Sequence, residues 1–411
     1  MAFILFSLVW NLSSQNFHVE IPARDEIDYY HNKLQIPGKD SSKINSFFQK
    51  FDSLYVFGTG KINILHIGGS HIQADFLSNQ VRRNLDDINR GYKPSRGYIF
   101  PFNIAKTNNP VNYTVKYKGI WNSVRIVQRN REIPVGMGGI AVYTKDPEAE
   151  IMVNLNVDES DIRWNFNELQ LIGYADEDSE DVKPVLKYGD SFIEARYDSI
   201  TKTYRYSLPK SADAFTICIR QDGTKPHTFY LHGFLPQNDE EGIVYHSIGL
   251  NGASVNSYLQ CEYFEDELSL IQPDLVVFEI GVNDATGRDF REETFIDNYN
   301  LLIEKIQRIS PECTFIFITN NDSYKRISRR KYAVNKNGLV AQKAFFRLAE
   351  MHKGGVWDLF SVMGGLGSMQ KWEKTGLARI DKVHFTREGY TLIGNLFYNA
   401  LMNYYLKNEI E

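Results

Sequence analysis

The sequence predicts an α/β protein in which a parallel sheet, covered by helices, is interrupted by an all-β domain of the sandwich type. The first observation is a set of short, almost wholly apolar runs, such as Asp274–Ile280, which are typical of strands buried on both faces. The second is that segments with helical spacing, such as Glu292–Ile309, alternate with these runs. The third is a long stretch, residues 112–235, in which apolar and polar residues alternate between recurring turn signals.

The α/β domain begins with a strand, a glycine turn and a helix. Ile62–Ile67 (INILHI) is an apolar run that ends at Gly68-Gly69, and the apolar positions of His71–Ile88 then recur at helical spacing. Residues 24–57 have mixed polarity and are expected to form a helical lead-in. Residues 24–111 are therefore expected to be the first part of this domain.

The inserted all-β domain is expected over residues 112–238. Turn signals such as Asp146-Pro147 and Asp222-Gly223 separate its alternating runs. We expect strands at Tyr113–Tyr117, Ser123–Val127, Ala149–Val157, Glu168–Ile172, Ala214–Ile219 and Thr228–Leu231.

The second part of the α/β domain is expected over residues 239–411, where strands and helices alternate again. Expected strands are Ile243–Ile248, Asp274–Ile280, Thr314–Thr319 and Val356–Leu359, and expected helices are Ala253–Leu270, Glu292–Ile309, Leu339–His352 and Glu388–Leu406.

The bulk composition narrows the class of function. The chain has 411 residues, of which 43% are hydrophobic and 24% charged, which is ordinary for a globular protein with a sizeable core. A net charge of −5 does not suit a nucleic-acid-binding protein, which normally carries a basic patch. One basic run is interpreted as a solvated helix or loop face rather than a polyanion site. It consists of Lys325, Arg326, Arg329, Arg330 and Lys331.

The three cysteines give no sign of a metal centre or a disulfide framework. Cys218, Cys261 and Cys313 lie far apart, their number is odd, and no Cys/His spacing typical of zinc is present. We therefore expect free, buried thiols. No metal or organic cofactor is expected.

The N-terminus resembles a secretory signal peptide. Residues 2–10 (AFILFSLVW) form a short apolar run, and small and polar residues follow it. The run is too short to cross a bilayer, which needs about 20 apolar residues. We expect residues 1–20 to be a signal peptide or its remnant, the mature chain to be exported to the periplasm or cell envelope, and no transmembrane segment to be present.

A serine follows the first predicted strand. In Gly68-Gly69-Ser70-His71 the hydroxyl of Ser70 would be exposed at a turn between strand and helix, and its backbone N–H would lie at the start of the helix, where it can stabilise an oxyanion. Read alone, the motif is better explained by Ser70 as a helix N-cap.

Two further segments carry polar groups suited to the same chemistry. Asn283, in Gly281-Val282-Asn283-Asp284, follows a buried strand, and its amide can donate to a developing negative charge. His384 lies three residues after Asp381, so the carboxylate can hold one ring nitrogen while the other accepts a proton. Each segment alone is also ordinary turn or capping chemistry.

Any one of the three segments could occur by chance. Their order along the chain, and their places at the boundaries of strands and helices, make chance a less plausible explanation for all three together. Open α/β sheets bind ligands at the carboxyl ends of their strands, where these segments are expected. Gly252, in a further glycine segment after the strand Ile243–Ile248, offers another backbone N–H to the same site. We expect Ser70 as nucleophile, His384 as base and Asp381 as its orienting acid.

These blocks resemble the SGNH, or GDSL-like, hydrolase family. Its four blocks are similar to Gly68-Gly69-Ser70, Gly252, Gly281–Asp284 and Asp381–His384 of this sequence, and GGSHIQAD looks like the GDSHIQAD form of exported bacterial members. The resemblance implies a flavodoxin-like α/β/α fold and an oxyanion hole formed by Ser70, Gly252 and Asn283. Gly69 stands where the family usually has Asp, which puts catalytic efficiency in doubt.

The predicted β-insertion resembles the arrangement in bacterial peptidoglycan O-acetylesterases, in which a carbohydrate-binding-module-like sandwich interrupts the hydrolase domain. This resemblance implies an O-acetylesterase acting on peptidoglycan or another acetylated polysaccharide through an acyl-serine intermediate. Two alternatives remain: a polysaccharide O-acetyltransferase, and a carbohydrate-binding protein with a degenerate esterase fold.

Overall fold

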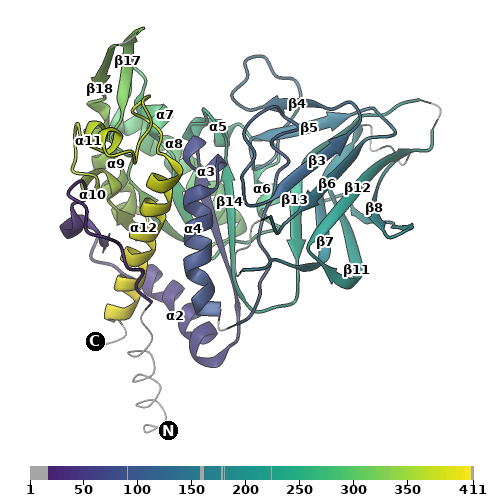
Figure 1. Ribbon diagram of the computed structural model, residues 1–411, viewed down its shortest axis with the longest axis horizontal. Helices are drawn as coiled ribbons and strands as arrows, with labels where there is room; N and C mark the ends of the chain where they lie inside the picture. The colour runs from purple at the N-terminus through teal and green to yellow at the C-terminus, as the bar shows by residue number, and fades with distance from the viewer. Residues whose placement is uncertain are drawn as a thin grey trace.

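The computed structural model describes residues 17–89, 91–157, 162–176, 179, 181–223, 225–329 and 331–408. Its centre is a six-stranded sheet of order β1-β19-β16-β15-β2-β14 (Figure 1). Neighbouring strands are parallel except at the edge, where β1 runs antiparallel to β19. The strands are β1 (Leu34–Gln35), β2 (Lys61–Gly68), β14 (Gly242–Gly249), β15 (Leu275–Glu279), β16 (Thr314–Ile318) and β19 (Gly355–Trp357).

Helices cover both faces of this sheet, because alternate strand residues point to opposite sides. In β15, Leu275 and Val277 belong to one core cluster, and Val276 and Phe278 belong to the other. The predicted α/β/α fold is confirmed. The first cluster contains residues of α2 (Ser42–Phe57), α4 (Phe76–Asn84) and α12 (Arg387–Asn408), and the second contains residues of α5 (Val255–Leu259), α6 (Phe264–Leu268), α8 (Glu292–Ile309) and α9 (Asn337–Met351).

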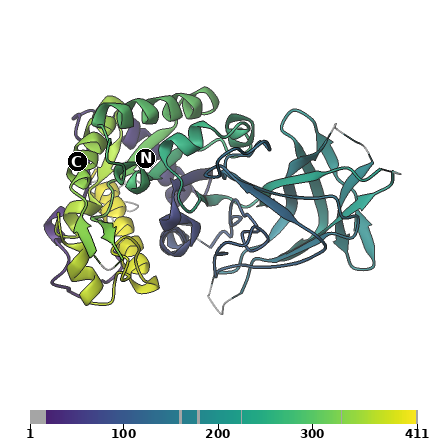
Figure 2. The ribbon, with the colours of Figure 1, turned by 90° about the horizontal axis from the view of Figure 1, so that it is seen from above.

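Between β2 and β14 the chain forms two further antiparallel sheets, of orders β10-β11-β7-β13-β5-β4 and β3-β6-β12-β8-β9. They pack face to face: the rings of Phe166 and Phe215, from different sheets, lie 5.7 Å apart edge to face. Figures 1 and 2 show these strands on one side of the α/β part. The exact domain boundaries stay a prediction. The strands are β3 (Thr114–Lys118), β4 (Asn122–Arg125), β5 (Ile140–Thr144), β6 (Glu150–Asn154), β7 (Phe166–Ala175), β8 (Val182–Tyr188), β9 (Ser191–Ile193), β10 (Arg196–Asp198), β11 (Thr203–Ala212), β12 (Ala214–Gln221) and β13 (Phe229–Gln237).

Short elements complete the α/β part. A two-stranded hairpin follows β16, where the basic run had been expected to form a helix face or a loop. The elements are η1 (Tyr29–His31), α3 (Ser70–Gln73), η2 (Leu85–Asn89), α7 (Val282–Ala285), β17 (Tyr324–Ser328), β18 (Lys331–Val334), α10 (Leu359–Val362) and α11 (Met369–Lys374).

Three expected helices differ from the structure. The helix expected over His71–Ile88 is broken at Asp75, which has a left-handed φ of 54°. The helix expected over Ala253–Leu270 divides into α5 and α6, because the chain at Tyr263 bonds to Val135 of the β-rich segment. The lead-in is α-helical only from Ser42, after the short helix η1, because Leu34–Gln35 pairs with β19 instead.

The expected signal peptide falls largely on residues 1–16, which lie outside the described residues. Over the part of the chain that the structure describes, no helix combines the length and the apolar character needed to cross a bilayer.

Candidate active site

Three neighbouring strands end at the same edge of the central sheet. In the parallel ladders Gly68, the last residue of β2, pairs with Gly249 of β14 and with Glu279 of β15. The segments containing Ser70, Gly252 and Asn283 each follow directly, so the fold gathers them where open α/β sheets bind ligands.

Close packing at this edge explains two of the glycines. A Cβ added to Gly68 would lie 2.2 Å from a side-chain carbon of Ile72, and one added to Gly249 would lie 2.5 Å from the backbone nitrogen of Gln73. No side chain fits at either position without moving α3. The two glycines therefore let α3, which begins with Ser70, lie against the strand ends.

Ser70, His384 and Asp381 form a continuous hydrogen-bonded line. Ser70 Oγ lies 2.8 Å from His384 Nε2, and His384 Nδ1 lies 2.9 Å from Asp381 Oδ2. The ring nitrogens have opposite roles in this line, which favours a proton on Nδ1 and a lone pair on Nε2 aimed at the serine hydroxyl. The expected nucleophile, base and acid are thus in contact, although 314 residues separate the first two.

The Asp381 carboxylate is held by its own loop. Its Oδ1 accepts the backbone N–H groups of Val383, at 2.9 Å, and His384, at 3.0 Å. Partial burial opposes ionisation, but these bonds and the contact with the His384 ring lower the pKa of Asp381 well below its usual range. Asp381 is therefore a carboxylate at neutral pH, able to stabilise a protonated His384.

Asn283 lies beside the nucleophile turn. Its Nδ2 donates to the carbonyl oxygen of Ala253 at 2.8 Å and lies 3.6 Å from the position that a Cβ on Gly69 would occupy. The amide thus joins α7 to the glycine segment containing Gly252, whose φ of 83° suits glycine. The adjacent Asp284 accepts the N–H of Val255, and partial burial raises the pKa of Asp284 to about 6.

Gln73 is a site residue whose role the sequence did not reveal. It is buried on α3, and its Oε1 accepts the backbone N–H of Asn251 at 2.7 Å. Its Nε2 donates to Thr107 Oγ1 at 3.1 Å and to the backbone oxygen of Asn108 at 3.0 Å. Gln73 therefore fixes the glycine segment relative to the nucleophile helix. The sequence places Gln73 one helical turn after Ser70, which could have marked it as a site residue. Its hydrogen-bond partners come from distant segments, so the sequence could not show its role.

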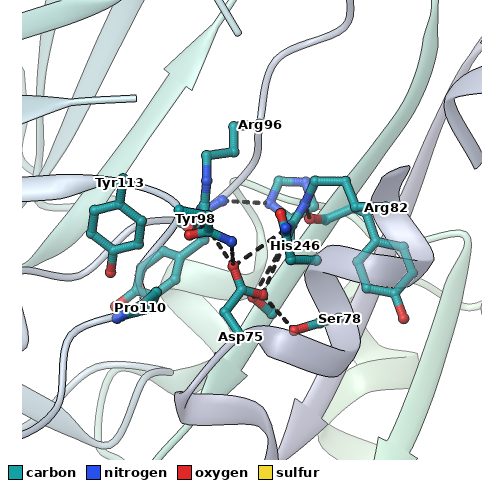
Figure 3. Close-up of polar contacts among 12 residues, drawn as sticks. Asp75, Ser78, Arg82, Arg96, Tyr98, Pro110, Tyr113 and His246 are labelled. Atoms are coloured by element: carbon teal, nitrogen blue, oxygen red, sulfur yellow. Dashed lines mark hydrogen bonds and ion pairs between the residues drawn. The ribbon is translucent and has the colours of Figure 1, made fainter. Parts of the chain in front are cut away.

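Asp75, between α3 and α4, connects several distant segments of the chain. Its carboxylate is buried and accepts from Arg96 at 2.6 Å, Asn112 at 2.7 Å and Arg82 at 3.3 Å (Figure 3). Ser247 of β14 donates to it at 3.1 Å. These partners tie the end of α3 to α4, to the central sheet and to the segment leading into β3.

His71 is buried next to His384. Its Nδ1 lies 2.8 Å from Tyr390 Oη, and its ring centroid is 5.4 Å from that of His384. Burial, together with the nearby His384, lowers the pKa of His71 to about 3. A neutral His71 adds no charge that would oppose protonation of His384.

Comparison with known protein families gives one match. The model of the GDSL-like lipase/acylhydrolase family matches residues 188–392, which include Gly252, Asn283, Asp381 and His384. Ser70 lies before the matched range, separated from it by most of the strands of the two extra sheets. No curated protein matches the sequence.

Solved structures give the fold. A structure of a peptidoglycan O-acetylesterase matches with a TM-score of 0.71 and 20% identity, over 90% of this chain and 99% of that one. A lipase/acylhydrolase from Enterococcus faecalis (23% identity, 40% of this chain and 78% of that one) and an acetyl xylan esterase (19%, 38% and 81%) match with TM-scores of only 0.31. The first match extends over both the α/β part and the strands between β2 and β14, and the family model covers most of the candidate site. Over residues 188–392 the chain is thus similar to the GDSL-like lipase/acylhydrolase family.

Proposed function

We propose that this protein is a serine esterase that removes O-acetyl groups from a cell-envelope polysaccharide, most specifically peptidoglycan. The single observation that carries the enzyme class is the line of contacts from Ser70 through His384 to Asp381, with distances of 2.8 and 2.9 Å. A half-buried Ser–His–Asp line at the carboxyl edge of an α/β sheet is suited to acyl transfer.

The proposed reaction begins with His384 as general base. It takes the proton from Ser70 as Oγ attacks the acetyl carbonyl, and Asp381 stabilises the imidazolium. His384 then returns the proton to the departing sugar oxygen, which leaves acetyl-Ser70. A water molecule, deprotonated by the same histidine, releases acetate and restores the serine.

The tetrahedral oxyanion needs donors on the side of Ser70 away from His384. We assign this role to the backbone N–H groups of Ser70 and Gly252 and to the side-chain amide of Asn283. The position of Asn283 Nδ2 beside Gly69 supports the assignment. One such donor is typically worth about 10²–10³-fold in kcat.

Peptidoglycan is the preferred substrate because the matched O-acetylesterase shares the whole architecture, including the two antiparallel sheets, rather than the hydrolase part alone. Export to the cell envelope, as the N-terminal sequence suggests, would bring the enzyme to this polymer. Both statements are part of the proposal.

Acetate release tests the proposal. The purified protein and Ser70→Ala are incubated with O-acetylated peptidoglycan and, separately, with acetylated xylan. We expect release from peptidoglycan that disappears in the variant. Release from xylan alone would refute the substrate and keep the esterase class. If neither polymer releases acetate and a fluorophosphonate probe does not label Ser70, the proposed esterase activity is refuted. A carbohydrate-binding protein would then be favoured.

A further inference from the structure

The hairpin β17–β18 stands at the edge of the candidate active site. The backbone N–H of Tyr324, at the start of β17, donates to the carbonyl of Lys382 at 3.0 Å. Just before it, Asn321 Nδ2 donates to the carbonyl of Val383 at 3.1 Å. The base of the hairpin is therefore bonded to the loop that carries His384. Figure 1 shows both strands extending beyond the helices at the same end of the molecule as α7.

The hairpin is strongly basic. Arg326, Arg329 and Lys331 are exposed, and among the described residues none of them forms an ion pair with a carboxylate. Arg326 donates only to the backbone oxygens of Ser328 and Arg329, at 3.3 and 3.2 Å. Because the whole chain carries a net charge of −5, this concentration of positive charge is local.

Packing does not explain the composition of the hairpin. Its two strands pair only with each other, so they contribute to no larger sheet. Ile327, between the charged residues, is 66% exposed. Isolated two-stranded hairpins are marginally stable in water, and unpaired positive charges in such an element repel one another. An anionic ligand would offset that repulsion.

We propose that hairpin β17–β18 binds carboxylate groups of the polymer whose acetyl ester reaches Ser70. The inference rests on the proposed function and deepens it, since peptidoglycan carries carboxylates at regular intervals on its peptides. Arg326, Arg329 and Lys331 are the proposed ligands, and guanidinium groups match carboxylates with paired hydrogen bonds. Lys325 has a different role, because its Nζ donates to the carbonyl of Gly287, 3.4 Å away, in the loop after Asn283.

Carboxylates are preferred to phosphates because of where the hairpin is attached. Its backbone bond to Lys382 joins the base of the hairpin to the loop that carries His384, as expected for a surface that contacts the substrate chain itself. A separate phosphate-bearing polymer would gain nothing from that contact with the catalytic loop.

Sedimentation with insoluble peptidoglycan measures binding without turnover. The background is Ser70→Ala, and the variant adds Arg326→Gln, Arg329→Gln and Lys331→Gln. A matched control adds Lys39→Gln, Lys343→Gln and Lys407→Gln, which removes three exposed positive charges elsewhere in the α/β part. We expect the Kd to rise about tenfold in the hairpin variant and less than twofold in the control, and the difference to shrink at about 0.5 M salt.

Chemical treatment of the polymer identifies the anion. Amidation of the peptidoglycan carboxylates should weaken binding of the parent protein and leave the hairpin variant little changed. Equal binding by parent and hairpin variant would overturn the inference. So would binding that is lost only after acid removal of phosphate-bearing polymers.

Turnover separates this inference from the proposed function. In protein that retains Ser70, kcat/KM is measured for acetylated peptidoglycan and for 4-nitrophenyl acetate. The hairpin substitutions should lower the first value relative to the second by about tenfold. An unchanged ratio of the two values would contradict the inference. If the unmodified protein releases no acetate from peptidoglycan, the proposed substrate fails, while carboxylate-dependent sedimentation would still establish the anion site.

Discussion

Replacing Asp75 by Asn should strongly destabilise the fold, because it removes the counter-charge of two buried arginines. Asp75 is 2% exposed, Arg82 3% and Arg96 1% (Figure 3). Asn has the same shape, so the change removes charge and little volume. Breaking a buried ion pair by removing one partner typically costs about 3–5 kcal/mol. That is a large fraction of the roughly 5–15 kcal/mol that stabilises a typical domain.

The ionisation of Asp75 follows from the same contacts. Burial alone would raise the pKa of Asp75, but Arg82 and Arg96 hold it well below its usual range. Burial also lowers the pKa of Arg96, to about 10. Since the folded-state pKa of Asp75 is depressed, its stabilising contribution is complete above about pH 4 and is lost only in stronger acid. A measurement at pH 7 therefore sees the full effect.

Urea unfolding, followed by circular dichroism, is the assay. We expect Asp75→Asn to lower the free energy of unfolding by about 3–5 kcal/mol. The control is Asp222→Asn, which breaks an exposed 3.1 Å pair with Lys183 and should leave the midpoint almost unchanged. Arg96→Met should cost less in the Asp75→Asn background than in the unmodified protein, since the guanidinium has already lost its partner.

If Asp75→Asn lowers the free energy of unfolding by less than about 1 kcal/mol, the reasoning is refuted. The buried cluster would then contribute no more to stability than a surface ion pair does. Additive effects of the Asp75 and Arg96 substitutions would refute it independently, since additivity means that the two side chains do not interact.

Three further predictions concern catalysis and pH. Asn283→Ala should lower kcat for acetyl ester hydrolysis by about 10²–10³-fold with little change in KM, and a change confined to KM would exclude an oxyanion role. Gln73→Leu should lower kcat about tenfold or more, because the glycine segment loses its bond to the nucleophile helix. The control Gln80→Leu, on α4, should leave kcat unchanged. Equal effects of the two substitutions on kcat would show that only helix stability was lost. Burial, with help from His384 and Arg82 respectively, lowers the pKa values of His71 and His246 to about 3. Both histidines stay neutral in the folded state while the unfolded chain takes up protons below about pH 6.5, so stability should fall by about 1 kcal/mol for each between pH 7 and 5.5. His71→Asn should reduce this fall in urea unfolding, and an unchanged slope would contradict the low pKa.

The central sheet could be predicted because its signals are local. Strands such as β15 and β16 are short apolar runs bounded by polar residues, and the helix α8 has the bounds that its periodicity predicted. The residues of the candidate site could be predicted for the same reason: each follows a strand or lies in a short turn motif. What the sequence left open was their contact, and the structure brings Ser70 Oγ to 2.8 Å from His384 Nε2.

Most of the departures from prediction depend on partners distant in sequence. The break at Asp75 depends on Arg96, which lies beyond the end of α4. Strand β1 exists only because β19, more than 300 residues later, offers it an edge. The basic run was interpreted as a solvated helix or loop face, whereas its residues form the paired strands of hairpin β17–β18. Gln73 has ordinary helical character, and its function depends on Thr107, Asn108 and Asn251.

Gly69 stands where the family that the sequence resembles usually has Asp, and the structure explains how the turn is held without an acidic side chain. The carbonyl of Gly68 accepts the hydroxyl of Tyr258 at 2.7 Å. The carbonyl of Gly69 accepts the N–H groups of Ile72 and Gln73, at 3.2 and 3.1 Å. Both backbone acceptors before Ser70 are therefore satisfied by buried groups, one of which comes from the helix α5 behind the site. Since a Cβ at Gly69 would meet its nearest neighbours at 3.6 Å, glycine is not imposed there by lack of space. The turn before Ser70 is therefore held by backbone groups of α3 and by Tyr258 of α5, without a side chain at position 69.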